Sequence, residues 1–281
     1  LVNTPTRFNS ETTKNLARRL AENLEAPFVE LPIDSFINET VSQIDDLQIP
    51  FPSDMKTLHL TGFMKENIQA RDRSTRILAT LSSAFGGIFT CNANKTELTV
   101  GYGTLYGDLS GALAATADLW KHQVYALGRT LNRYFDKNMI PDEIFTVRPS
   151  AELSENQDIT KGLGDPLIYE YHDFLFRSFI EPWNRITPEE ILTWYSENCL
   201  EEKLGTPVSI KSIFKTHHDF ITDLEKWWNL FAGFAVAKRI QAPPLLAVSR
   251  RPYGYDLRES QIAPYYTDTY IHLKNSLLSN G

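Results

Sequence analysis

The residues that could do chemistry gather between Asn92 and Asp108, a segment that reads NANKTELTVGYGTLYGD. It follows an apolar run over residues 87–91 that is typical of a buried strand. Three glycines then leave the backbone accessible among polar groups. Glu97 precedes them and supplies a carboxylate. A strand that leads into a polar, Gly-rich segment is where an open α/β sheet usually builds its ligand site. The segment is therefore a candidate site for a nucleotide and its metal.

Glu97 lies at the predicted start of a helix, shortly after Asn92. A carboxylate beside polar amides at a strand end suits Mg²⁺, which prefers a few hard oxygen ligands completed by substrate phosphate. An acidic residue in a first helical turn also interacts favourably with the positive end of any helix. Position alone leaves both interpretations open.

The glycines at positions 101, 103 and 107 do not have the G-x-G-x-x-G spacing, and the chain has no Walker lysine pattern. Neither a dinucleotide fingerprint nor an NTPase P-loop is supported, and glycines of this kind usually mark tight turns. Lys121 opens a predicted helix after a small-residue turn. A cation and free N–H groups at such a position can bind phosphate, and a solvated surface lysine is the alternative.

Other basic side chains that could hold a polyanion occur at two places. Arg71 and Arg73 lie two residues apart, so they cannot share one face of a helix. One of them could point into a site while the other pairs with a neighbouring carboxylate such as Asp72. Lys238 and Arg239 form a basic pair at a predicted helix end, where interaction with the helix dipole is the simpler explanation.

The elements that must position these residues alternate between helix and strand in the first half of the chain, which favours an α/β fold with a parallel sheet. We expect a loop over 1–9, helices over 10–24, 34–44, 64–85 and 121–138, strands over 27–33, 87–91 and 144–147, a Pro-rich connection over 46–60 and a small-residue turn over 112–119. Gly86 and Gly87 supply a left-handed stop for the third helix.

After about residue 165 the predicted strands stop. Helices are predicted over 167–180, 188–199 and 208–237, and Thr187 can cap the second of them. We therefore expect residues 1–165 to form an α/β nucleotide-binding core and residues 166–281 to form a mostly helical C-terminal part of the same domain.

The composition limits the classes of protein to which this chain can belong. The chain has 281 residues, 42% of them hydrophobic and 22% charged, which is typical of a globular protein with a large core. The formal net charge of −7 argues against nucleic acid or an anionic membrane as partner, so a polyanionic ligand needs a local group of cations. Two cysteines, and the absence of a signal peptide or a transmembrane run, predict a soluble cytoplasmic protein.

The motifs taken together, in their order along the chain, resemble the NAD⁺ synthetase family, specifically the synthetase part of its glutamine-dependent bacterial form. The pair N-K-x-E and G-Y-x-T-L-Y-G-D is the most specific feature, and the similarity covers nearly the whole chain. The matching pieces are ENIQAR at 66–71, NKTE at 94–97, GYGTLYGD at 101–108, PSAEL at 149–153 and KRIQAP at 238–243.

The resemblance implies an adenine nucleotide α-hydrolase-like fold, with a Rossmann-like parallel sheet flanked by helices. It implies a ligase that uses ATP and Mg²⁺ to activate the nicotinate carboxylate of deamido-NAD⁺ as an acyl-adenylate. Pyrophosphate leaves, and ammonia, free or delivered from glutamine, then displaces AMP to give NAD⁺. A homo-oligomer is also expected.

The resemblance assigns roles residue by residue. Glu97 would bind Mg²⁺ and lie beside deamido-NAD⁺. The remaining assignments are Asn92, Lys121 and Ser150 for ATP, and Asn67, Arg71, Lys238 and Arg239 for deamido-NAD⁺. A metal with several cations would lower the repulsion between two negatively charged nucleotides and stabilise the departing pyrophosphate.

Two features depart from the family pattern. Asn92 replaces a threonine, and its amide can still donate or accept a hydrogen bond. The Ser-Gly-Gly-x-Asp-Ser loop that wraps the ATP pyrophosphate does not occur in this sequence. The expectation is therefore an N-terminally incomplete synthetase domain, with the phosphate loop and a glutaminase domain on a missing N-terminal part and with little activity of its own.

Two alternatives stay open at this point. One is another ATP-pyrophosphatase amidotransferase that makes a different amide, and the other is a non-catalytic assembly domain that keeps the fold. A sheet without its first strand would also expose apolar edges, which predicts poor solubility or a partner for the isolated chain.

Overall fold

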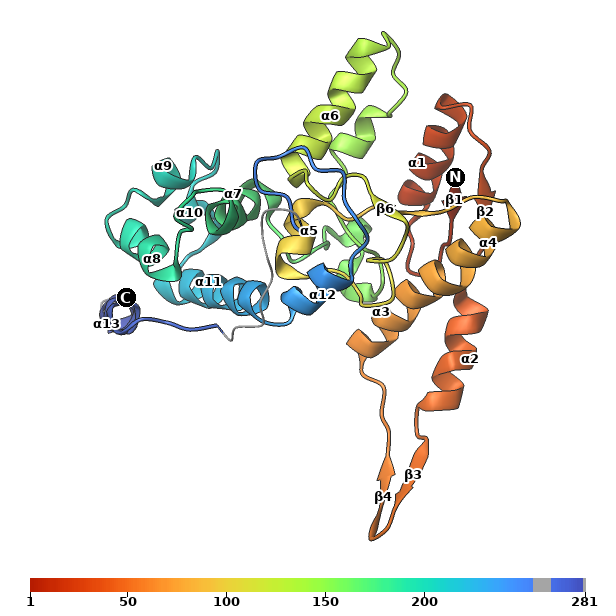
Figure 1. Ribbon diagram of the computed structural model, residues 1–281, viewed down its shortest axis with the longest axis horizontal. Helices are drawn as coiled ribbons and strands as arrows, with labels where there is room; N and C mark the ends of the chain where they lie inside the picture. Colours follow the sequence, from red (N-terminus) through yellow and green to blue (C-terminus); the bar gives the residue numbers. More distant parts are fainter. Residues whose placement is uncertain (255–263, 280–281) are drawn as a thin grey trace. The chain divides into compact units, whose positions relative to one another are not determined.

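The strands form short pairs in the computed structural model, which describes residues 1–254 and 264–279 (Figure 1). Two pairs are parallel: β1 (Val2–Asn3) with β2 (Val29–Glu30), and β5 (Thr90–Cys91) with β6 (Leu113–Ala114). Ala114 makes a further parallel bridge to Leu245. The third pair, β3 (Gln48–Phe51) and β4 (Asp54–Thr57), is an antiparallel hairpin.

Helices make up most of the described structure. They are α1 (Glu11–Asn23), α2 (Asp34–Ile44), α3 (Gly62–Arg71), α4 (Ala79–Ala84), α5 (Lys95–Val100), α6 (Lys121–Tyr134), α7 (Tyr169–Ile180), α8 (Pro188–Ser196), α9 (Leu200–Leu204), α10 (Ile210–Ile213), α11 (His217–Ala232), α12 (Ala235–Gln241) and α13 (Asp268–Ser279). A π-helical segment, Asp72–Leu78, joins α3 to α4, and short 3₁₀ turns cover Asp142–Phe145, Glu155–Gln157 and Ile159–Lys161. No helix among these is both long and apolar enough to cross a bilayer.

The chain divides into two compact units that exchange segments along the sequence. Unit 1 contains residues 1–89, 104–111 and 125–166, and unit 2 contains residues 90–103, 112–124 and 167–281. The candidate segment 92–108 therefore contributes to both units.

In unit 1, a buried glutamate organises the start of α1. Ser10 caps the helix by accepting a hydrogen bond from Thr13 N. The Glu152 carboxylate accepts from Ser10 N at 3.2 Å, from Thr13 Oγ1 at 2.6 Å and from Asn9 Nδ2 at 3.3 Å. Glu152 is buried and has a positive φ of 47°. The glutamate of the PSAEL motif thus joins that loop to the positive end of α1, where a carboxylate is electrostatically favoured.

In unit 2, large aromatic side chains of α7 and α11 form the core. Phe176 and Phe179 of α7 are fully buried, and Trp227 of α11 is almost so. Phe176 and Trp227 pack edge to face with ring centroids 5.6 Å apart. Edge-to-face aromatic pairs of this kind are stabilised beyond the burial of their area.

Several predictions about the elements are confirmed. The α/β class with parallel strand pairing is observed, and the helices predicted over 10–24, 34–44, 167–180 and 188–199 are present as α1, α2, α7 and α8. Thr187 caps α8 with a reciprocal capping box to Glu190, as its position predicts. Gly86, shortly after α4, ends this helical segment in a left-handed conformation with φ 76°.

Other predictions about the elements are wrong. The Pro-rich connection over 46–60 contains the β3–β4 hairpin, which extends beyond α2 and α3 in Figure 1. The sequence did not indicate β3 because Pro50 interrupts the expected alternation of apolar and polar residues. A two-stranded hairpin has free edges, so it accommodates a proline. Residues 142–145 form a 3₁₀ turn in place of a strand, and the helix predicted over 208–237 is three helices, α10, α11 and α12.

The remaining differences concern short strands and two helix ends. β1 lies in the predicted loop over 1–9, and β6 lies in the predicted small-residue turn. Only two residues of each predicted strand over 27–33 and 87–91 belong to the observed strands β2 and β5. The predicted helix over 121–138 ends earlier, at Tyr134. The side chain of Asp34 accepts from Arg7 N at 3.1 Å, so it joins α2 to the first loop and does not cap its own helix.

Candidate active site

The Asn94–Glu97 turn in unit 2 begins α5 with a reciprocal capping box. Asn94 Oδ1 accepts from Glu97 N at 3.0 Å, and Glu97 Oε2 accepts from Asn94 N at 3.1 Å. The prediction that Glu97 lies in a first helical turn is confirmed. One carboxylate oxygen therefore has a structural role, and the other, Oε1, determines what else this residue can do.

Glu97 Oε1 faces a cation and a phenol. Lys121 Nζ lies 4.0 Å from this oxygen, and Tyr169 donates a 3.4 Å hydrogen bond to it. The ammonium also lies 5.1 Å from the centroid of the Tyr169 ring. The two charged side chains are 20% and 18% exposed, so water screens them only partly. Unit 2 thus holds a carboxylate and an ammonium of partly desolvated, complementary charge side by side.

The backbone at the start of α6 corrects one expectation. Lys121 begins the helix as predicted, but its N–H donates to Thr96 Oγ1 at 3.2 Å. The next N–H, of His122, donates to Asp173 Oδ2 at 2.8 Å. Trp120, which precedes the helix, has no acceptor side chain that could cap it. These N–H groups are therefore not free for phosphate, and the Lys121 ammonium is the group at this helix start that could reach one.

Lys238 of α12 holds the Gly-rich segment in place. Its ammonium donates to Gly101 O at 2.7 Å and to Gly103 O at 2.6 Å. Arg239 is buried, and its guanidinium donates to Thr99 O at 2.5 Å and to Phe231 O at 2.9 Å. The basic pair at the end of α12 therefore fixes α5 and the backbone that follows it.

A close approach at Gly101 makes a specific prediction. A Cβ here would lie 2.9 Å from Lys238 Cδ and 3.0 Å from Ala235 Cα, and the φ of Gly101 is +66°. Gly86 has a similar φ of +76° with nothing within 4 Å of an added Cβ. We expect Gly86→Ala to cost about 1–2 kcal/mol from its φ alone. We expect Gly101→Ala to cost about 1–3 kcal/mol more, because of overpacking. Urea unfolding measures both, and equal costs would contradict the close approach.

In unit 1, the ENIQAR motif contacts the second half of the GYGTLYGD motif. Asn67 Oδ1 accepts from Thr104 Oγ1 at 2.7 Å, and Arg71 Nε donates to Leu105 O at 3.1 Å. Asp108 Oδ1 accepts from Thr104 N at 2.6 Å and closes the turn. The structure thus places Asn67 and Arg71 beside the Gly-rich loop, and their binding of deamido-NAD⁺ stays a prediction.

The π-helical segment that follows α3 separates the two neighbouring arginines. Arg71 is exposed, whereas Arg73 is partly buried, donates to Thr4 O at 3.0 Å, and has its pKa lowered by burial. Asp72 pairs with Arg76. The two arginines point in different directions as expected, and Arg71 remains exposed. The predicted pairing of one of them with Asp72 is wrong, because Asp72 pairs with Arg76 and Arg73 bonds to a backbone carbonyl.

Asn92 and Ser150, the other two residues predicted to bind ATP, are already engaged with the protein. Asn92 is exposed, and its Oδ1 accepts from Thr90 Oγ1 at 3.1 Å. Ser150 lies in unit 1, donates to Gln157 O at 2.6 Å and accepts from Glu152 N at 3.2 Å. Both hydrogen bonds orient the side chains, and neither tests a contact with ATP.

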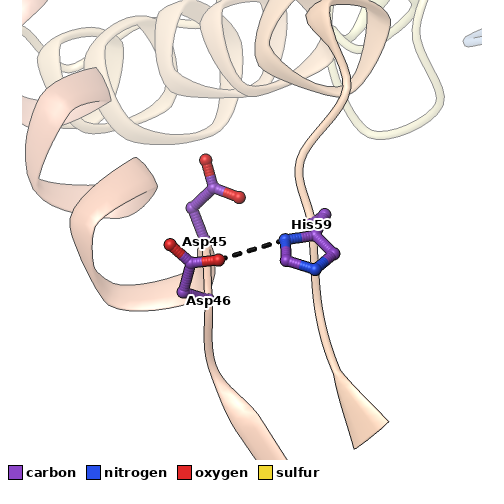
Figure 2. A group of neighbouring side chains, drawn as sticks. All are labelled: Asp45, Asp46 and His59. Carbon is purple, nitrogen blue, oxygen red and sulfur yellow. Dashed lines mark ion pairs between the residues drawn. The ribbon is translucent and has the colours of Figure 1, made fainter.

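Metal-ligating side chains also gather at the base of the β3–β4 hairpin, where Asp45, Asp46 and His59 place ligand atoms within 4.8 Å of one another (Figure 2). His59 Nδ1 lies 3.0 Å from Asp46 Oδ1, and both side chains are more than 70% exposed. The Leu60 N–H and the Lys65 ammonium hydrogen-bond to Asp45 and hold its pKa below the ordinary value. Because Lys65 already supplies a cation, we interpret this group as an exposed ion-pair cluster that joins the hairpin to α2 and α3.

Glu97 could bind Mg²⁺ without a group of several protein ligands. It presents a single hard oxygen, Oε1, that is partly buried beside a cation, and the described residues form no cage of three ligand groups around it. Mg²⁺ in nucleotide enzymes is commonly held by one or two carboxylates together with substrate phosphates and water. The donor set therefore matches a metal that arrives with a nucleotide.

The parallel strand pairs, the capped start of α5 and the Gly-rich loop together form an α/β protein with a candidate site for a charged ligand. The NAD synthase family model matches residues 2–210, and the chain belongs to this family. The resemblance drawn from the motifs is thereby confirmed.

Individual relatives agree with this assignment. The glutamine-dependent NAD(+) synthetase of Thermotoga maritima is 34% identical over 187 residues, which cover 66% of this chain and 30% of the relative. The NH(3)-dependent NAD(+) synthetase of Helicobacter hepaticus is 31% identical over 202 residues, with 71% and 68% covered. A crystal structure of a glutamine-dependent NAD(+) synthetase from Cytophaga hutchinsonii shares the fold, with a TM-score of 0.68 and 18% identity over 98% of this chain and 40% of that one.

The motifs did not indicate the roles of three residues that support this site. Thr96 and Asp173 bind the start of α6, and Tyr169 contacts both Glu97 and Lys121. Tyr169 and Asp173 lie on α7, more than 70 residues after Glu97 along the chain. No local pattern marks Tyr169 or Asp173. Thr96 lies within the NKTE motif, but its role depends on tertiary packing.

Proposed function

We propose that this protein catalyses the ATP-dependent amidation of deamido-NAD⁺ to NAD⁺. The chain spans 30% of the length of the Thermotoga relative and 68% of the Helicobacter one, so the activity, the substrates and the nitrogen donor are all part of this proposal. The observation that carries it is the Glu97–Lys121 pair, partly buried at the start of α5 and α6 in a chain of the NAD synthase family.

The reaction proceeds in two steps. A nicotinate carboxylate oxygen attacks the α-phosphorus of ATP, the bond to the bridging oxygen breaks, and pyrophosphate leaves with that electron pair. Ammonia then attacks the carbonyl carbon of the acyl-adenylate, the bond to the AMP oxygen breaks, and the nitrogen loses a proton to give the amide. The ammonia is free or is released from glutamine.

The residues of this chain meet the electrostatic demand of the first step. Glu97 Oε1 would hold Mg²⁺, which when bound neutralises phosphate charge and stabilises the leaving pyrophosphate. The Lys121 ammonium would bind an ATP phosphate oxygen from the adjacent position. Because both side chains are partly buried, these interactions are stronger than they would be in water. Asn92 and Ser150 would complete the contacts with ATP.

The contacts with deamido-NAD⁺ would come from residues that hydrogen-bond to the Gly-rich loop. Asn67 and Arg71 would bind the dinucleotide from α3, where the exposed Arg71 side chain supplies positive charge. Lys238 would also bind deamido-NAD⁺, while its ammonium holds the carbonyls of Gly101 and Gly103. The burial of Arg239 supports a structural role, and its contact with deamido-NAD⁺ stays a prediction, as does a homo-oligomer.

The test is an assay of the full-length protein for NAD⁺ with deamido-NAD⁺, ATP and Mg²⁺, supplied with ammonia or with glutamine. We expect NAD⁺, AMP and pyrophosphate in equal amounts. Deamido-NAD⁺ should also raise the thermal unfolding temperature, whereas other substrates of ATP-pyrophosphatase amidotransferases should not. No product with either nitrogen donor would rule the proposal out.

Arg71 provides a prediction specific to the dinucleotide. We expect Arg71→Lys to raise KM for deamido-NAD⁺ about tenfold. Lysine lacks the planar guanidinium group, which can donate to Leu105 O and to a ligand at the same time. KM for ATP should change less than twofold. Steady-state kinetics with each substrate varied in turn measures both values, and Arg18→Lys on α1 is the control for loss of a partly exposed guanidinium. Equal changes in the two KM values would contradict the assignment.

A further inference from the structure

Asp173 of α7 is a buried carboxylate that binds three donors from two other segments of unit 2. It has no exposed side-chain surface. Oδ1 accepts from Thr96 Oγ1 at 2.5 Å. Oδ2 accepts from His122 N at 2.8 Å and lies 2.7 Å from His122 Nδ1. An ionised Asp173 carboxylate can only accept, and in that state Nδ1 donates in this contact.

These bonds form a chain that ends at the two charged residues of the proposed active site. Thr96 donates its hydroxyl hydrogen to Asp173 and accepts from Lys121 N on the same oxygen. Thr96 also precedes Glu97 within α5. His122 follows Lys121, and its ring stacks on Phe174 at 5.2 Å between centroids. The backbones that carry Glu97 and Lys121 are therefore fixed to one buried carboxylate.

An ordinary helix cap does not account for this arrangement. A capping side chain usually belongs to the residue that precedes its own helix. Here Trp120 occupies that place, and the acceptors come from α5 and α7. One acceptor oxygen would satisfy an N–H, whereas Asp173 binds a hydroxyl, an amide and an imidazole together. The arrangement fixes the distance between two helix starts as well as satisfying their polar groups.

We propose that Asp173, acting through Thr96 and His122, is the positioning residue that sets Lys121 opposite Glu97 for the phosphates of ATP. This inference rests on the proposed function. Its consequence is that the Lys121 side chain, and not the N–H groups of α6, supplies the contact with phosphate. Asp173 and Thr96 do not touch the substrate.

The test compares Thr96→Val and Thr96→Ser in the full-length protein. Valine keeps the shape of threonine and removes the oxygen that links Asp173 to Lys121 N, whereas serine keeps that oxygen. Asp173→Asn removes the charge and one acceptor. Thr130→Val, on the exposed face of α6, is the control for loss of a threonine hydroxyl that bonds only within its own helix. Two readouts are used: KM for ATP and for deamido-NAD⁺, and amide hydrogen exchange at 121 and 122 without ligand.

We expect Thr96→Val to raise KM for ATP about tenfold or more and to speed amide exchange at 121 and 122, because small misplacements of a binding group are costly. KM for deamido-NAD⁺ should stay within about twofold. Thr96→Ser and Thr130→Val should behave like the wild type. Asp173→Asn should show a larger rise in KM for ATP than Thr96→Val, and the threonine pair still tests the inference if this variant does not fold.

The outcomes separate the inference from the proposed function. Wild-type protein that binds no ATP and makes no NAD⁺ would overturn both. Active wild type with an unchanged KM for ATP in Thr96→Val would overturn the inference alone, whether or not amide exchange changes. Equal changes in KM for both substrates, or a Thr96→Ser variant that is no better than Thr96→Val, would also overturn it.

Discussion

Replacement of Glu97 by glutamine is expected to lower kcat for NAD⁺ formation about 100-fold or more, the size of effect seen when one stabilising group for transition-state charge is removed. The substitution removes the negative charge that faces Lys121 and would hold Mg²⁺. It keeps the capping box, because a glutamine at this helical position can still accept from the Asn94 N–H. The fold should therefore survive while the chemistry fails.

The chain offers a matched control for this substitution. Glu190 occupies the same position in the capping box of α8, where its carboxylate accepts from Thr187 N at 2.9 Å. Glu190→Gln makes the same chemical change at the same kind of helix start, outside the proposed site. Both variants should unfold within about 1 kcal/mol of the wild type, and only Glu97→Gln should lose turnover.

The dependence on Mg²⁺ sharpens the result. If Glu97 holds the metal, Glu97→Gln should need a higher Mg²⁺ concentration for half-maximal rate than the wild type and than Glu190→Gln. Initial rates over a Mg²⁺ titration measure this. A variant that keeps its full kcat, or that loses activity with an unchanged Mg²⁺ requirement, would contradict the assignment of Glu97 as the metal ligand.

The sequence predicted best those elements that are determined locally. The Asn94–Glu97 and Thr187–Glu190 spacings place an acceptor and a carboxylate three residues apart, and both form capping boxes. The β3–β4 hairpin was missed because its pairing depends on a turn and on register, and Pro50 interrupts the alternation. Two-residue strands such as β1 and β6 carry too few side chains to show any period.

The same distinction applies to the candidate site. A local pattern places Glu97 and Lys121 in the first turn of a helix, and the resemblance to the family supplied their proposed roles. Their mutual contact, and the role of Asp173, arise from packing between segments far apart along the chain. The occupied N–H groups of α6 could not be predicted for this reason, since Thr96 and Asp173 meet them only in the folded chain.

The lysine of the N-K-x-E motif has a structural role that its position did not indicate. Lys95 is fully buried, and its ammonium donates to Asp118 Oδ1 at 2.8 Å, to Ser249 Oγ at 2.9 Å and to Arg251 O at 2.9 Å. Asp118 also accepts from Val248 N at 2.7 Å and Ser249 N at 2.6 Å. This buried ion pair joins α5 to the segment that follows α12 and satisfies every charge in it.

Lys95→Met should therefore destabilise unit 2 by about 3–5 kcal/mol, because it leaves the Asp118 carboxylate buried without a cation. The double variant Lys95→Met/Asp118→Asn removes the stranded charge and keeps an acceptor for the Val248 or Ser249 N–H. It should recover about 1–2 kcal/mol of that loss. Lys137→Met, which removes an exposed partner of Glu25, is the control and should change the free energy of unfolding by less than about 0.5 kcal/mol.

The destabilisation caused by Lys95→Met should depend on pH in a defined direction. Burial raises the pKa of Asp118, but hydrogen bonds from Lys95, Ser249 and Val248 outweigh it and hold the pKa below the ordinary value. The folded wild type therefore binds this proton less readily than the unfolded chain, so its stabilising contribution is present above about pH 4 and is lost as the pH falls through the lowered pKa. Without Lys95, burial alone should raise the pKa of Asp118, and protonation should then relieve the stranded charge. The difference in free energy of unfolding between wild type and Lys95→Met should shrink as the pH falls from 7 to about 4, and urea unfolding at several pH values measures it. A difference independent of pH would show that the loss comes from packing and not from the buried charge.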